Sequence, residues 1–281
     1  MNEIIVFLLK VLPLNILSLL FGVIASLNLP KPLLKVIFHF YVIHYNVKTS
    51  EAEKNLEEYK TINEFFTRKL KPGLRPIDNG TTSIVSPVDG KVLSFGKITD
   101  NTLEQVKGMT TNMQDLIDIP GYKSRFSGGN YIIIYLSPRD YHRIHYPVSG
   151  KLSGYSYIPG KLFPVNYFAV SSIKNLFSVN ERVATYIETK NGLCSLIKVG
   201  ATNVGSIVVN YDSSLKTNKL FSKGTTQLYT TTQEVKKGEE LGRFEMGSTV
   251  ILLFEKDKTH LEKLSRNQLL QFGESIAEWV K

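Results

Sequence analysis

The sequence contains very little cysteine, tryptophan or histidine. Its 281 residues include one cysteine, Cys194, one tryptophan and five histidines. A single cysteine excludes an internal disulfide framework and a zinc site built from several cysteines. Glycine periodicity, sustained heptads and low-complexity tracts are also missing, which excludes the collagen-like, coiled-coil and low-complexity classes.

The composition is that of a folded, basic protein. Hydrophobic residues make up 42% of the chain and charged residues 21%, so the chain can build a core and global disorder is excluded. Fourteen tyrosines and fifteen phenylalanines suit a β-rich interior. The 34 Lys and Arg outnumber the 25 Asp and Glu and give a net charge of +9, which favours an anionic partner. The basic residues are dispersed and no aromatic-basic recognition motif is present, so we expect a phosphate-rich lipid surface and no nucleic acid.

The segment 1–46 differs from the rest of the chain. It contains two apolar runs, residues 4–27 and 33–43, separated by Pro30-Lys31-Pro32. The uninterrupted part of the first run is slightly shorter than the roughly 20 residues that span a membrane. The acidic start, Met1-Asn2-Glu3, argues against a cleaved export signal. We expect a membrane-surface or shallowly inserted helical hairpin with basic flanks; two ordinary buried helices are the alternative.

Residues 47–82 are predicted to form a short helical linker region. Two capping boxes follow one another, Ser50 with Glu53 and Thr61 with Glu64, and each predicts a short helix.

From residue 83 to residue 281 the sequence is typical of a β-rich domain. The apolar segments 131–136, 206–209 and 250–254 each predict a buried strand, with glycine and proline between them. We therefore expect the α+β class, with N-terminal membrane-associated helices followed by a β-rich catalytic domain.

Two sequence patterns occur twice in this domain. Residues 87–92, Pro-Val-Asp-Gly-Lys-Val, are echoed by 147–152, Pro-Val-Ser-Gly-Lys-Leu, and residues 235–244 are echoed by 270–279. Each copy places a glycine turn before a strand. Together the echoes predict a β sandwich or flattened barrel with a pseudo-twofold internal repeat.

The segment 137–147 is the richest in chemically active residues, because His142 and His145 lie three positions apart directly after a predicted strand. Loops held by a rigid scaffold often carry function. Three interpretations are open: surface histidines, zinc ligands together with Asp89 in a membrane-associated hydrolase, or a general base oriented by a carboxylate.

A general base requires a nucleophile, and Ser248 is the candidate. Gly247 and Ser248 directly precede the predicted strand 250–254. Glycine tolerates strained backbone conformations, and its carbonyl has no neighbouring Cβ to obstruct attack by the serine hydroxyl. A simple turn into a strand is the alternative.

The order of several motifs resembles the bacterial-type phosphatidylserine decarboxylase proenzymes. The matching blocks run in the family order from residue 64 to residue 254, with Met246 where the family motif commonly has leucine. They are Glu64-Phe-Phe-Thr-Arg68, Leu74-Arg-Pro-Ile-Asp78, Ser86-Pro-Val-Asp89-Gly90, Ser137-Pro-Arg-Asp-Tyr-His-Arg-Ile-His145, Leu162-Phe-Pro-Val-Asn166, Asn180-Glu-Arg182, Val199-Gly-Ala-Thr-Asn-Val-Gly-Ser206 and Gly242-Arg-Phe-Glu-Met-Gly247-Ser248-Thr249.

The resemblance implies a zymogen that cuts itself between Gly247 and Ser248. The fragments would be a β chain of residues 1–247 and an α chain of residues 248–281, which we expect to remain associated. Ser248 would become a pyruvoyl group that forms a Schiff base with phosphatidylserine, releases CO₂ and yields phosphatidylethanolamine. No metal is implied.

The resemblance also implies roles for individual residues. We assign the base for self-cleavage to His145, oriented by Asp89, and proton donation during decarboxylation to His142. Phe163 is a candidate for the acyl-chain entrance, although a core-packing turn explains it equally well.

The implied location is the cytoplasmic face of the cell membrane, where the protein would be peripheral, bind phosphatidylserine in an anionic bilayer and form a homodimer. A non-enzymatic alternative is a membrane-tethered carrier module that presents Lys151 or Lys237 in a tight turn.

Overall fold

The computed structural model describes residues 2–202, 206–219, 222–245, 248–261 and 264–280. The apolar N-terminal segment forms three helices, α1 (Asn2–Val11), α2 (Leu14–Ala25) and α3 (Lys31–Tyr45). No single helix in these ranges is both long and apolar enough to cross a membrane; α1 and α2 meet these two criteria only as a pair, bent by 69°. Pro13 lies at the bend, as expected of a residue that interrupts helical hydrogen bonding.

The linker region folds into three short turns of helix. They are η1 (Thr49–Glu51), η2 (Leu56–Glu58) and α4 (Ile62–Phe66). The capping box at Thr61 is confirmed, since its hydroxyl accepts a hydrogen bond from the Glu64 backbone N–H at 3.0 Å. The helix predicted from Ser50 is wrong: Ser50 lies inside the 3₁₀ turn, and the reciprocal box is instead formed by Asn55 and Glu58.

The β-rich domain is organised around an eight-stranded antiparallel sheet. Its order is β11-β7-β8-β9-β13-β5-β2-β15. The strands are β2 (Gly90–Lys97), β5 (Asn130–Leu136), β7 (Gly150–Ile158), β8 (Arg182–Thr189), β9 (Gly192–Val199), β11 (Thr225–Val235), β13 (Ser248–Phe254) and β15 (Leu269–Leu270). The three strands predicted from apolar runs are confirmed as β5, β13 and the short strand β10 (Ile207–Val209).

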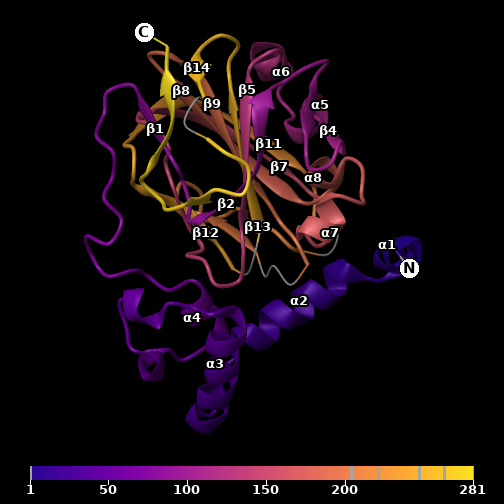
Figure 1. Cartoon of the computed structure of the whole chain (residues 1–281), viewed down its shortest axis with the longest axis vertical. Coiled ribbons are helices and arrows are strands. Elements are labelled where there is room, and N and C mark those ends of the chain that lie inside the picture. Colours follow the sequence, from indigo (N-terminus) through magenta and orange to yellow (C-terminus); the bar gives the residue numbers. More distant parts are fainter. Residues whose placement is uncertain (1, 203–205, 220–221, 246–247, 262–263, 281) are drawn as a thin grey trace.

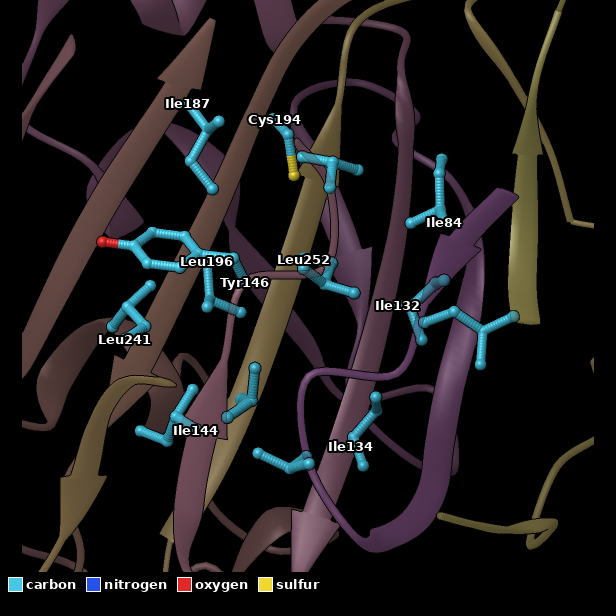
Figure 2. Packing of buried hydrophobic residues seen from close by; sticks show 14 of the residues in the cluster. Ile84, Ile132, Ile134, Ile144, Tyr146, Ile187, Cys194, Leu196, Leu241 and Leu252 are labelled. Atoms are coloured by element: carbon cyan, nitrogen blue, oxygen red, sulfur yellow. The ribbon is translucent and has the colours of Figure 1, made fainter. Parts of the chain in front are cut away.

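Two three-stranded sheets pack on one face of the large sheet. One has the order β1-β16-β14 and the other β10-β12-β6. Their remaining strands are β1 (Ser83–Val85), β6 (Arg143–His145), β12 (Glu240–Phe244), β14 (Thr259–His260) and β16 (Ser275–Trp279). The core between the layers contains Ile84, Ile144 and Leu241 from the small sheets against Ile132, Leu196 and Leu252 from the large one (Figure 2).

The other face of the large sheet is covered by short elements. They are the hairpin β3 (Thr102–Glu104) and β4 (Thr110–Asn112) with helices α5 (Met113–Leu116), α6 (Pro120–Phe126), α7 (Tyr167–Val170) and α8 (Leu176–Val179). Along β13, Ile251 and Leu253 face this second core while Val250 and Leu252 face the first. A strand that is buried on both faces has a continuous run of apolar residues, and this run is why β13 could be predicted from the sequence. The mixed α+β class is thus confirmed.

The repeated sequence patterns occupy corresponding places in the sheets. Gly90 at the start of β2 pairs with Leu270, and Gly150 at the start of β7 pairs with Val235. The two turns that follow have left-handed glycines, Gly238 and Gly273, with φ of +85° and +92°. The matching strand starts and glycine turns agree with the two repeated sequence patterns. A twofold repeat of the whole domain stays a prediction.

The N-terminal helices lie at one end of the β-rich body, beside α4 (Figure 1). Phe38 of α3 packs on Phe65 of α4 with ring centroids 4.9 Å apart, and the Tyr41 hydroxyl donates a 2.6 Å hydrogen bond to the Pro138 carbonyl. The helical end is therefore attached directly to the loop that follows β5.

Candidate active site

Ser248 is the first residue of β13, and its position is fixed by pairing with β5. It lies opposite Leu136, the last residue of β5, directly before the loop that carries the histidines. Ser248 is fully buried, and its Oγ has no hydrogen-bond partner among the described residues. An unpaired buried hydroxyl costs about 1–3 kcal/mol, so such a group is expected where chemistry requires it. The predicted cleavage residue Gly247 lies outside the described residues.

The loop after β5 is locked by its own polar groups. The Asp140 carboxylate accepts hydrogen bonds from the backbone N–H and the hydroxyl of Ser137, both at 2.7 Å. Burial raises the pKa of Asp140, and these two hydrogen bonds oppose that effect. The loop therefore delivers the next residues in one conformation.

His142 is fully buried at the end of this loop. Its Nδ1 lies 2.8 Å from the Asp140 carbonyl, and its ring centroid lies 3.9 Å from that of Phe66. Because a carbonyl only accepts, Nδ1 carries the proton and Nε2 holds the lone pair, which has no partner among the described residues. Burial lowers the pKa of His142 to about 3. At neutral pH this imidazole is uncharged, and its Nε2 lone pair is available to accept a hydrogen bond.

Strand register gives the two histidines different neighbours in β12. The Phe244 backbone N–H donates a 3.0 Å hydrogen bond to the His142 carbonyl, whereas His145 lies opposite Glu240. Phe244 is four residues before Ser248 and Glu240 is eight. The structure thus brings His142 and Ser248 to the same end of the large sheet.

His145 lies in β6 and has both ring nitrogens occupied. Nδ1 lies 2.8 Å from the Gly238 carbonyl, which makes it the protonated nitrogen, and Nε2 accepts a 3.1 Å hydrogen bond from the Tyr141 hydroxyl. The Phe272 ring stacks on the imidazole at 3.8 Å with an interplanar angle of 10°. Burial lowers the pKa of His145 as well.

Asp89 does not form the expected hydrogen bond with His145. Its carboxylate accepts from Arg75 Nη2 at 2.7 Å and from the Phe272 backbone N–H at 2.8 Å, while Arg75 also pairs with Glu51 at 2.6 Å. The predicted direct contact is therefore corrected: Asp89 is linked to His145 through Phe272, whose N–H donates to the carboxylate and whose ring covers the imidazole, and the Asp89 charge also acts on His145 without contact.

Three residues at this site have no role in the sequence interpretation. Arg75 lies inside a motif block that carries the resemblance, Tyr141 directly precedes His142, and Phe272 lies in the second copy of the glycine-turn echo. Of the three, only Phe272 is marked by a sequence pattern other than the family motifs. It occupies in the second copy of the repeated pattern the position that Lys237 has in the first, and the residue after Lys237 is Gly238, whose carbonyl faces His145.

Phe163 is buried against the second core and also lines a cavity of about 400 Å³ beside α1 and α2. A separate cavity of about 380 Å³ is lined by Phe21, Tyr41, Phe66 and Leu136, and thus joins the helices to the end of β5. Both cavities are largely apolar, so their chemistry suits a hydrocarbon chain.

The alternative interpretations find little support in the geometry. Within the ranges described, no group of three or more His, Cys, Asp or Glu residues is placed to hold a metal ion, so Asp89, His142 and His145 do not form a ligand set. The Lys237 ammonium donates to the carbonyls of Gly80 and Ser83 at 2.9 and 3.2 Å, which ties it to the protein surface. Lys151 is exposed on β7.

Comparison with known proteins gives one consistent result. A family model described as phosphatidylserine decarboxylase matches residues 62–278. The chain is 44% identical over 270 residues to a phosphatidylserine decarboxylase proenzyme of Myxococcus xanthus, covering 96% of each chain. It is 42% identical to proteins of the same name from an Anaeromyxobacter species and from Brevibacillus brevis, covering 94–95% of them and 95% of this chain.

The burial of neutral His142 predicts a loss of stability at acidic pH. Between pH 6.5 and about 3, an unfolded chain binds a proton at this imidazole that the folded chain does not, so lowering the pH favours unfolding. At pH 5 the effect is about 2 kcal/mol. In a Ser248→Ala background, which keeps processing constant, His142→Gln should lose less stability between pH 7 and pH 5, measured by urea unfolding.

Exposed His260→Gln is the control and should keep the parental pH dependence. An identical pH dependence in His142→Gln would contradict the assignment of His142 as a buried neutral imidazole.

Proposed function

The chain belongs to the phosphatidylserine decarboxylase family, and from this premise we propose that it cuts itself between Gly247 and Ser248 and then converts phosphatidylserine to phosphatidylethanolamine. One observation carries the proposal beyond the resemblance. Among the described residues, the Ser248 hydroxyl is buried without a hydrogen-bond partner at the same end of the sheet as the neutral His142, whose Nε2 also lacks one.

Self-cleavage uses only groups of the chain and one water molecule. Ser248 Oγ attacks the Gly247 carbonyl carbon and gives up its proton to a base, so that the peptide bond is replaced by an ester and the Ser248 amine is freed. Elimination then removes the α-proton of residue 248 and expels the Gly247 carboxylate, leaving a dehydroalanine. Addition of water releases ammonia and leaves a keto group at the new N-terminus.

The residues around Ser248 fit a pyruvoyl group. The serine is desolvated, and the described neighbours leave both its hydroxyl and His142 Nε2 without a hydrogen bond. When formed, the pyruvoyl carbonyl supplies an electrophile for the substrate amine and an electron sink for the carbanion produced by CO₂ loss.

His142 moves the proton that this chemistry requires. The substrate arrives as an ammonium ion, which must lose a proton before its nitrogen can react. Neutral His142 accepts a proton at Nε2 and returns it to the α-carbon after CO₂ has left. Its lowered pKa favours the second half of this cycle, because the protonated ring gives the proton up readily, whereas the neutral ring is a weak proton acceptor.

His145 and Asp89 are assigned to self-cleavage. The assignment rests on the motif resemblance, and it requires Nε2 of His145 to exchange the Tyr141 hydroxyl for the serine proton. Asp89 supports the ring through Phe272 and holds the buried Arg75. Arg75 in turn fixes Glu51 of the linker region against the β-rich domain.

The N-terminal helices hold the active site at the bilayer. Their exposed side chains are largely apolar, including Leu17, Leu20 and Ile24 along one face of α2, which are 44–55% exposed. Apolar surface of this extent marks an interaction site. We assign it to peripheral attachment at the cytoplasmic face of an anionic membrane, with the Phe163 cavity as the acyl-chain entrance; a homodimer is implied by the family resemblance alone.

The two histidines are predicted to separate cleavage from decarboxylation. His145→Ala should stay uncut on denaturing gels, like the control Ser248→Ala, because the serine proton has no acceptor. His142→Ala should be cut but lose about 10²–10⁴-fold in CO₂ release from phosphatidylserine, since proton transfer contributes an acceleration of that order.

An uncut His142→Ala variant would reverse the two assignments. A wild-type protein that is cut but releases no CO₂ from phosphatidylserine would overturn the proposed activity itself.

Membrane attachment is predicted to depend on the exposed face of α2. The triple variant Leu17→Gln, Leu20→Gln and Ile24→Gln should bind vesicles of mixed phosphatidylglycerol and phosphatidylcholine at least about tenfold more weakly in sedimentation assays, because three apolar side chains no longer leave water. The matched control is Leu228→Gln with Leu269→Gln, two leucines outside the helices that are 53% and 64% exposed. Unchanged vesicle binding of the triple variant would exclude this face as the attachment surface.

A further inference from the structure

Buried polar atoms without partners gather around one part of the molecule. Among the described residues, the atoms concerned belong to the segment 59–68, His142 and residues 248–249, with Ser195 in β9 as the exception. They are Tyr59 Oη, Asn63 Oδ1, Arg68 Nε and Nη1, His142 Nε2, Ser248 Oγ and Thr249 Oγ1. Folded proteins satisfy most buried polar atoms, so such a concentration indicates a place where a ligand supplies the missing partners.

Arg68 has two buried donor atoms without hydrogen-bond partners among the described residues, whereas each other residue in this group has one unpartnered atom. Arg68 follows α4 and is 4% exposed, and toward the other described residues it uses only Nη2, which donates to the carbonyls of Arg139 at 2.7 Å and Asp140 at 3.4 Å. Burial lowers the pKa of Arg68, yet a guanidinium remains protonated at neutral pH. Within the described ranges it forms no ion pair, and its nearest stacking partner is the Phe65 ring at 5.4 Å. A buried cation with two free donors requires an anion.

Arg68 lies beside His142 because both bind the same carbonyl. The Asp140 carbonyl accepts from Arg68 Nη2 and from His142 Nδ1, which lies 2.8 Å away. The unpartnered nitrogen atoms of Arg68 and His142 therefore lie on two side chains that are held next to each other.

The adjoining cavity has an excess of positive charge at Arg68. This cavity of about 220 Å³ is lined by four cations, Lys48, Arg68, Arg75 and Arg139, and by three carboxylates, Glu51, Asp89 and Asp140. The carboxylates are already engaged: Arg75 binds Glu51 and Asp89, and Asp140 binds Ser137 and lies 3.7 Å from Arg139. Arg68 is thus the cation that a bound anion would neutralise.

We infer that Arg68 binds the phosphate of the phosphatidylserine head group, an inference that rests on the proposed function. The substrate offers two anions, a carboxylate and a phosphate. A cation paired with the carboxylate would stabilise the ground state, because that charge disappears as CO₂ leaves. The phosphate keeps its charge from substrate to product and lies only a few bonds from the carbon that His142 reprotonates. The planar guanidinium fork also matches phosphate oxygens better than an ammonium does.

The test compares substrates with and without the phosphate. Dihexanoyl-phosphatidylserine carries it, whereas O-octyl-L-serine keeps the amine, the carboxylate and a hydrocarbon tail but lacks it. After self-cleavage has been verified on gels, Arg68→Gln should lower kcat/KM for dihexanoyl-phosphatidylserine by about 100-fold, and that for O-octyl-L-serine by less than about threefold. Arg68→Lys, which keeps the charge but not the fork, should lie between Arg68→Gln and wild type. Arg266→Gln, the same change in an arginine paired with Glu104 on the surface, is the control.

Binding gives a readout that is independent of turnover. The product analogue dihexanoyl-phosphatidylethanolamine, titrated calorimetrically, should bind Arg68→Gln at least about tenfold more weakly than wild type. If Arg68→Gln remains uncut, Arg68→Lys replaces it in the test. Its loss of kcat/KM should then be larger for dihexanoyl-phosphatidylserine than for O-octyl-L-serine. Equal losses for the two substrates, or no loss for either, would overturn the inference. A wild-type enzyme inactive on dihexanoyl-phosphatidylserine would instead overturn the proposed function.

Discussion

The pairing of β13 with β5 is the interaction on which the rest of the site depends. It sets Ser248 opposite Leu136 and so fixes a serine against the point where the chain leaves the sheet toward His142. Both strands are buried on two faces, and this burial holds the register. Seven consecutive residue pairs join the strands from Ser248–Leu136 to Phe254–Asn130. The same pairing is expected to keep the α chain attached after cleavage, because β13 belongs to the fragment 248–281 and β5 to the fragment 1–247.

Desolvation then determines the chemistry. Within the part of the chain that the structure describes, Ser248 Oγ and His142 Nε2 are buried without hydrogen-bond partners, so no described residue stabilises either group in its resting state by a competing hydrogen bond. Burial keeps His142 neutral at physiological pH and makes its protonated form a strong proton donor. The helical end of the molecule contributes to this burial, since Phe66 covers the imidazole and Tyr41 binds the Pro138 carbonyl. The helical end of the molecule thus takes part in closing the active site.

The parts of the structure that follow local rules were predictable from the sequence. Strands β5 and β13 are continuous apolar runs, the Thr61 cap has a clear signature, and His142 lies in the loop after one predicted strand while Ser248 lies just before another. The α+β class follows from the change near residue 83, where predicted helices give way to short apolar strand segments separated by glycine and proline.

The contacts that depend on distant segments were not predictable. Asp89 is 183 residues from Phe272 along the chain. No pattern in the sequence shows that the Phe272 backbone N–H and Arg75 would bind the Asp89 carboxylate, which was predicted to bind His145. The Gly238 carbonyl reaches His145 through a turn 93 residues away. The helix expected at Ser50 failed for a local reason, because Asn55 and Glu58 form a competing box a few residues later.

The most direct test of the account is the intact mass of the two chains of freshly purified protein under denaturing conditions. The account predicts a large fragment ending at Gly247 and a small fragment of residues 248–281 that is lighter by one ammonia than the peptide produced by plain hydrolysis. A single uncut chain in a preparation that decarboxylates phosphatidylserine, or a small fragment with an intact N-terminal serine, would contradict it.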